Sequence, residues 1–145
     1  MKFIERVRQF SLKKAGYINL TIAVINILIH VFVMAGILPY TWVNGGRTEN
    51  YEAACSIAFS SIIVIAVTML LTLIASGIIP VKFNRFFGIF LTVILIVLLP
   101  FSFIGIVQQF LGTLFEKCFC SILALISFLT AFRIAFEKRW PEKKV

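Results

Sequence analysis

Long apolar stretches alternate with short polar ones along this chain. Four runs of 22 to 25 residues stand out: 15–38, 55–79, 86–107 and 114–136. A helix needs about 20 apolar residues to cross the roughly 30 Å hydrocarbon core of a bilayer. Lipid offers no partner to unpaired backbone groups, so such segments must be helical. The pattern therefore predicts an all-α integral membrane protein with four antiparallel transmembrane helices in one bundle, forming a single domain over residues 1–145.

The positions of the basic residues predict the orientation. Of the 14 Lys and Arg residues, only Arg47 and Lys117 lie outside the two termini and the connection between the second and third runs. Cytoplasmic loops carry the excess of Lys and Arg, so we expect both termini in the cytoplasm. The first run exceeds the 7–15 apolar residues of a signal peptide and should persist as a span. We expect a multi-pass protein of a bacterial plasma membrane.

The net charge of +8 is explained by the membrane topology, because the basic residues lie mostly on the predicted cytoplasmic side. Basic residues beside a span attract anionic headgroups, so membrane lipids are expected partners. A nucleic-acid partner is not expected, because no soluble domain could carry a basic groove. A homo-oligomer is left open. Residues 2–14 place four apolar side chains on one helical face, which suits a short interfacial helix. A flexible basic tail is the equal alternative.

Polar residues within the spans form two stripes. Asn19, Asn26 and His30 lie at offsets of 7 and 11, within about 40° of one another on a helix. Polar groups are costly in lipid, so this stripe should face the bundle interior. His30 is either a hydrogen-bonded packing group or a functional base. The second stripe has the same spacing, but its hydroxyls can bond their own backbone, which weakens the signal: Ser61, Thr68 and Thr72.

The longest connection, residues 39–54, contains the best candidate for a binding loop. Asn44-Gly45 predicts a turn with positive φ. Gly45-Gly46-Arg47 could bind an anion through exposed amides and a guanidinium. The alternative is a plain turn beside an interfacial aromatic belt.

The expected site lies at the extracytoplasmic end and takes a small anionic or lipid-like ligand. Arg47 would hold an anionic group, and unliganded it would pair with a glutamate there, for which Glu49 is also available. Aromatic contact would come from the loop, and His30 with a carboxylate would tune the pocket. Thr113 and Glu116 form a predicted capping box at the start of the fourth run. The predicted ligand-binding residues are His30, Trp42, Arg47, Tyr51, Glu52 and Glu116.

No metal or cofactor is expected, because one histidine and scattered carboxylates do not supply a ligand set. Three cysteines fall near the outer ends of the runs. Cys55 could bridge to Cys118 or to Cys120, or all three could be free thiols. The sequence contains no Cys-x-x-Cys, serine elbow or phosphate-binding loop.

Two short motifs carry a family resemblance. Trp42-Val-Asn-Gly-Gly-Arg47 with Glu52, followed by Phe115-Glu116-Lys117, resembles an uncharacterised family of small four-span bacterial membrane proteins. Trp, Gly, Gly and Arg are contiguous in that family, whereas Val43 and Asn44 intervene here. The resemblance covers most of the chain in layout and implies no activity.

Three functions compete, and whether the protein is an enzyme stays open. We favour a non-enzymatic protein that binds a small molecule, lipid headgroup or protein partner at its extracytoplasmic end. The alternative is a membrane-embedded enzyme that acts on a lipid or sterol-like substrate, with His30 and a carboxylate exchanging protons. The third is a small exporter, which would need a carboxylate within a span, whereas the acids here lie at or beyond span ends.

Overall fold

The computed structural model describes residues 2–82 and 84–139, so Lys143 and Lys144 of the predicted basic C-terminus lie outside it. Over the described residues the chain is helical, with no strand. Its elements are α1 (Lys2–Gln9), α2 (Leu12–Met34), the 3₁₀ turns η1 (Tyr40–Trp42) and η2 (Asn44–Gly46), α3 (Tyr51–Ala75), α4 (Arg85–Phe110), the π-helical turn η3 (Glu116–Cys120), and α5 (Ser121–Ala135).

The all-α prediction is confirmed. Four helices are long and apolar enough to cross a membrane when η3 is counted with α5, which indicates a multi-pass membrane protein. The third and fourth helices match the predicted runs to within three residues, and α4 continues through Pro100. Residues 2–9 form the helix that was predicted as one of two alternatives for the N-terminal segment.

The first two helices begin three to four residues before the predicted runs 15–38 and 55–79. Ser11 and Asn50 are the reason, because each caps a helix N-terminus. Their side-chain oxygens accept from the amide three residues on, at 3.4 and 2.8 Å. Each helix therefore begins at a polar capping residue, one turn before its apolar run. Hydropathy alone does not count this first turn as part of the helix.

The same two helices also end four residues early, at a glycine. Gly36 and Gly77 have φ of 70° and 71°, a left-handed conformation that glycine adopts without strain. After each glycine, the next amide donates to the carbonyl five residues before it, at 2.9 and 3.1 Å. This is a Schellman ending, so the apolar residues beyond it belong to the connections.

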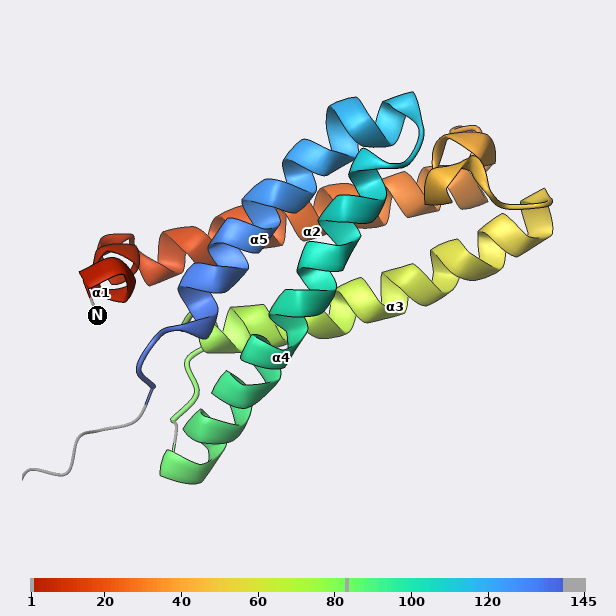
Figure 1. The fold of residues 1–145 in the computed structure, drawn as a ribbon. Helices are drawn as coiled ribbons and strands as arrows, with labels where there is room; N and C mark the ends of the chain where they lie inside the picture. Colours follow the sequence, from red (N-terminus) through yellow and green to blue (C-terminus); the bar gives the residue numbers. More distant parts are fainter. Residues whose placement is uncertain (1, 83, 140–145) are drawn as a thin grey trace, which may run out of the picture.

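The four long helices pack against one another unequally, and α4 runs at a slant to α3, so that the two diverge towards the end that carries η1 and η2 (Figure 1). The helix α3 packs on α2, α2 packs on α5, and α5 packs on α4, whereas α3 and α4 make few contacts with each other. We call the end that carries η1 and η2 the loop end. The opposite end, where α1 meets the last turn of α5, is the termini end.

At the termini end, one arginine ties three helices together. The guanidinium of Arg139 donates to the carbonyl of Ala75 in α3 at 3.3 Å, to the hydroxyl of Thr92 in α4 at 3.0 Å, and to the carbonyl of Ile134 in α5. Burial lowers the pKa of Arg139 to about 10, against the opposing effect of Glu137. The group therefore stays charged at neutral pH, and its bonds hold α3 and α4 to the same point.

Gly16 brings α2 and the end of α3 into close contact. A Cβ on Gly16 would lie 2.4 Å from Ser76 Oγ and 2.6 Å from Ser76 Cβ, and Ser76 is 1% exposed. Small residues allow such close approach between membrane helices.

We expect Gly16→Ala to lower the thermal unfolding temperature in detergent, because overpacking costs about 1–3 kcal/mol. Gly105→Ala is the matched control, since a Cβ there meets no atom within 4 Å. Both substitutions favour helix formation equally, so the difference between them isolates the contact. Equal unfolding temperatures would show that α2 and α3 are not in close contact at Gly16.

Candidate functional site

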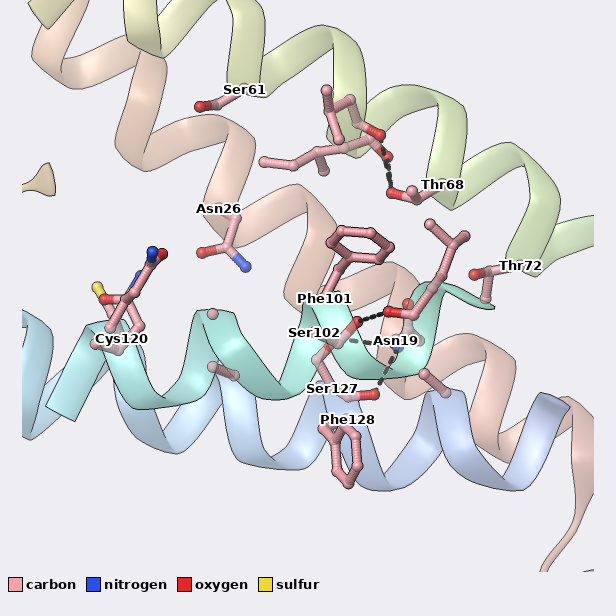
Figure 2. Close-up of a pocket in the computed structure, with 18 of the residues that line it drawn as sticks. Asn19, Asn26, Ser61, Thr68, Thr72, Phe101, Ser102, Cys120, Ser127 and Phe128 are labelled. Carbon is pink, nitrogen blue, oxygen red and sulfur yellow. Dashed lines mark hydrogen bonds between the residues drawn. The ribbon is translucent and has the colours of Figure 1, made fainter. Parts of the chain in front are cut away.

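A cavity of about 770 Å³ lies between α2, α3, α4 and α5 (Figure 2). Both predicted polar stripes line it, which confirms that Asn19, Asn26 and His30 face the interior of the protein. A third set of polar residues comes from α4. The polar lining consists of Asn19, Asn26 and His30 in α2, Ser56, Ser60, Ser61, Thr68 and Thr72 in α3, Ser102, Gln108 and Gln109 in α4, and Ser127 in α5.

Towards the termini end, most polar groups of the cavity are bonded within the protein. The Asn19 amide donates to the Ser127 carbonyl, the Ser127 hydroxyl and the Thr130 hydroxyl, each at 3.1 Å, which ties α2 to α5. The hydroxyls of Thr68 and Ser102 donate to carbonyls in their own helices at 2.9 and 3.0 Å. These groups therefore line the cavity with little free hydrogen-bonding capacity.

Towards the loop end, polar atoms lack partners. His30 Nδ1 and Gln109 Oε1 are buried and have no hydrogen bond within the described chain. Asn26 faces the cavity, and no other described residue bonds its side chain (Figure 2). Buried polar groups are nearly always hydrogen-bonded, so the unpartnered atoms in this half of the cavity are available to a polar group that enters it.

The cavity opens sideways between α3 and α4, where the two helices make few contacts. Lining residues on this side are well exposed, with Val64 at 62% and Phe101 at 66%. Both belong to the central parts of apolar helices. The opening therefore faces the region that lipid chains would occupy around a membrane-spanning protein.

No Asp, Glu, Lys or Arg side chain lines the cavity among the described residues. Nor do those residues contain a cluster of three or more His, Cys, Asp or Glu side chains that could hold a metal ion. The lining offers amides, hydroxyls, one imidazole and hydrocarbon. Its chemistry is hydrogen bonding to an uncharged group beside an apolar surface.

The predicted anion site at Gly45 is occupied by the protein itself. Asn44, Gly45 and Gly46 have φ of 57°, 71° and 66°, as expected for the predicted turn. The Gly45 amide donates to both oxygens of the Glu116 carboxylate at 3.1 and 3.0 Å. The predicted capping box is confirmed, because the Thr113 amide donates to Glu116 at 2.8 Å and the Glu116 amide donates to the Thr113 hydroxyl at 3.3 Å.

The expected ion pair of Arg47 with a glutamate is absent from the described residues, and this prediction is wrong. Glu116 is 4% exposed and bonded to backbone amides, so its charge is already balanced by oriented dipoles. Arg47 and Glu52 are exposed at the loop end. Neither residue lines the cavity.

The two predicted aromatic residues pack within the loop end. The indole of Trp42 lies 5.7 Å from the Phe115 ring, and the Tyr51 hydroxyl donates to the Met34 carbonyl at 2.6 Å. Trp42 also borders a second, more apolar hollow of about 450 Å³. Of the six predicted site residues, the structure places only His30 in the large cavity.

The polar face of α4 was not among the predicted site residues, although Gln108 and Gln109 fall near the outer end of the third apolar run and a further signal was present. Ser102, Gly105 and Gln109 lie at offsets of 3 and 7, which puts them on one helical face. The three cysteines, whose pairing the sequence left open, are free thiols in the structure.

No protein-family model, curated protein or solved structure matches this chain.

Proposed function

We propose that the four long helices cross a bacterial plasma membrane as antiparallel spans of one bundle, with both termini in the cytoplasm. The apolar length of the helices supports the spans, and the excess of Lys and Arg at the termini end supports the orientation. The loop end then faces outward, and the cavity lies within the outer and middle parts of the bilayer.

Cysteine labelling tests this orientation. In a variant whose three native cysteines are replaced by serine, Glu49→Cys should react with a membrane-impermeant maleimide on intact cells, because Glu49 is exposed at the loop end. Lys82→Cys, exposed at the other end, should react only after lysis. The reverse pattern would place the termini outside and contradict the proposal.

We propose further that the protein binds an amphipathic small molecule or lipid in the cavity. The single observation that carries this is a 770 Å³ cavity with unpartnered polar atoms at one end and an opening between α3 and α4. Its volume lies within the roughly 300–1,000 Å³ typical of ligand sites. A lipid could enter from the bilayer without passing through water, with its polar group meeting His30 and its chain lying against leucines.

The geometry favours binding over catalysis. Acid–base chemistry by His30 would need a partner within hydrogen-bond reach, and no described carboxylate lines the cavity. Glu116 is bonded to the loop, and Glu52 is exposed. An exporter of the type considered above would need a titratable carboxylate on the transport path, and the lining supplies none.

Filling the cavity tests the proposed function. Gly105 lines the cavity, and a Cβ there meets nothing within 4 Å, so Gly105→Phe should occupy the space without disturbing the fold. We expect it to reduce photo-crosslinking by a diazirine-labelled lipid at least fivefold. Ile104→Phe is the matched control, because Ile104 is 52% exposed and does not line the cavity. Equal crosslinking of both variants, with unfolding temperatures near wild type, would refute binding in this cavity.

A further inference from the structure

We infer that the ligand of the cavity is an uncharged amphiphile with a hydroxyl-bearing head, such as a monoacylglycerol or an isoprenoid alcohol. This inference rests on the proposed function and specifies its ligand class. It excludes the anionic lipids that the basic residues of this protein would otherwise attract.

The first argument is electrostatic. No Asp, Glu, Lys or Arg is among the described lining residues, so protonated His30 is the one state that would carry a formal charge there. The Glu116 carboxylate does not line the cavity and is bonded to the loop. An ionised headgroup moved from the interface into such a lining would leave water without gaining a counter-charge. That transfer is strongly unfavourable, whereas a neutral hydroxyl needs only hydrogen bonds.

The second argument concerns the unpartnered atoms. Gln109 Oε1 can only accept a hydrogen bond, and His30 Nδ1 accepts or donates according to its tautomer. A hydroxyl donates one hydrogen bond and accepts others, so it can satisfy either atom. A carbonyl, as in a quinone or an ester, only accepts and would leave Gln109 Oε1 without a partner.

The third argument is the shape of the lining. From His30 to Asn19 the cavity follows α2 for 11 residues, about 16 Å. Beyond the polar group at the loop end, Leu95, Leu99 and Phe128 provide an apolar surface. One end with unpartnered polar atoms, and another where hydrocarbon lies beside polar groups that are mostly bonded within the protein, match a single-chain amphiphile lying along the helix axis.

Binding to the purified full-length protein in a neutral detergent tests this class. The probes are 1-monooleoylglycerol and geranylgeraniol, compared with oleate at pH 8 and dioleoylphosphatidylglycerol, each titrated as a competitor of a diazirine-labelled monoacylglycerol. We expect one or both hydroxyl probes to compete at least tenfold better than either anion. Which of the two competes identifies a glycerolipid or an isoprenoid as the source.

The variants locate the head of the ligand. Gln109→Leu and His30→Leu should each lower the affinity for the hydroxyl probe about tenfold, because each removes a hydrogen-bonding atom. His30→Gln should restore most of the affinity, since its amide still donates and accepts. Thr21→Val is the control: Thr21 lies on α2 outside the cavity, with its hydroxyl bonded to Tyr17.

The outcomes separate this inference from the proposed function. One outcome would be that an anionic probe competes as well as the hydroxyl probes and that its binding is lost in Gly105→Phe. This would overturn the inference of an uncharged ligand but would leave the cavity as a binding site. Hydroxyl binding that is unchanged in both leucine variants would also overturn the inference. If Gly105→Phe reduced the binding of none of the probes, the proposed function itself would be overturned.

Discussion

Glu116→Ala should release the loop end of the protein and lower its stability by roughly 2–4 kcal/mol. The carboxylate accepts from the Gly45 amide, the Thr113 amide and the Thr113 hydroxyl, and it lies 4% exposed. Hydrogen bonds to a charged acceptor stabilise more than neutral ones, and the substitution leaves two backbone donors without partners. The same change removes the glutamate half of the capping box that Thr113 and Glu116 form at the start of the last long helical segment.

Glu116→Gln should show an intermediate loss of about 1–2 kcal/mol, because one acceptor oxygen is replaced by an NH₂ group that faces backbone N–H donors. Hydrogen exchange at the Gly45 and Thr113 amides should quicken in both variants, together with a lower thermal unfolding temperature. Glu52→Gln is the matched control, since it removes an exposed carboxylate at the same end of the chain. If the Gly45 amide exchanged as slowly in Glu116→Ala as in the wild type, the bond to the loop would not exist.

Most of the fold could be predicted from hydropathy and helical period. A 24-residue apolar run predicts a helix long enough to cross a membrane, and a polar stripe at offsets of 7 and 11 predicts a helix face turned toward the other helices. Helix ends were less predictable, because Ser11 and Gly36 act through single hydrogen bonds and a single φ angle. A hydropathy average does not register single capping residues. When Ser11 and Gly36 are considered individually, they place the two ends of α2 correctly.

The partner of the Gly45 turn could not be predicted, although the turn itself could. A left-handed Asn-Gly-Gly run exposes amides that bind an anion, and the sequence offers several glutamates near the same end. Which one binds depends on how η3 is placed against a loop 71 residues earlier in the chain. That placement comes from helix packing and has no local signal.

The candidate site was expected at the loop and instead lies between the helices. Loops attract functional interpretation because charged and aromatic residues gather there. In this protein those residues bind one another or remain exposed. Two buried polar atoms of the loop, Asn44 Nδ2 and Thr48 Oγ1, also lack partners among the described residues. The unpartnered buried atoms that line the cavity, however, are those of His30 and Gln109 on different helices. The stripe on α4 could have been read from the spacing of Ser102 and Gln109, but its meeting with the stripe on α2 depends on packing.

The largest effect is expected at the termini end, where Arg133→Met should detach α1 and cost about 3–5 kcal/mol. Arg133 is 6% exposed in α5, and its guanidinium donates to the Phe10 carbonyl at 2.7 Å, to the Arg8 carbonyl at 3.0 Å and to Glu137 at 2.6 Å. Two of these acceptors are carbonyls at the end of α1, which have no partner inside their own helix. Arg8 returns the contact by donating to the Phe136 carbonyl at the end of α5, at 2.8 Å.

An eight-residue helix is marginal in isolation, so α1 depends on this contact. Hydrogen exchange of the α1 amides should therefore lose protection in Arg133→Met, and the exposed Lys13 should become more susceptible to trypsin. Arg133→Lys keeps the charge but lacks the planar fork, so it should bond fewer of the three acceptors. Its protection of the α1 amides should fall between that of the wild type and that of Arg133→Met. Arg6→Met removes an exposed charge from α1 itself and should leave the exchange unchanged. Slow α1 exchange in Arg133→Met would mean that apolar contacts such as Phe3 on Phe132, at 6.2 Å, hold the helix without the arginine.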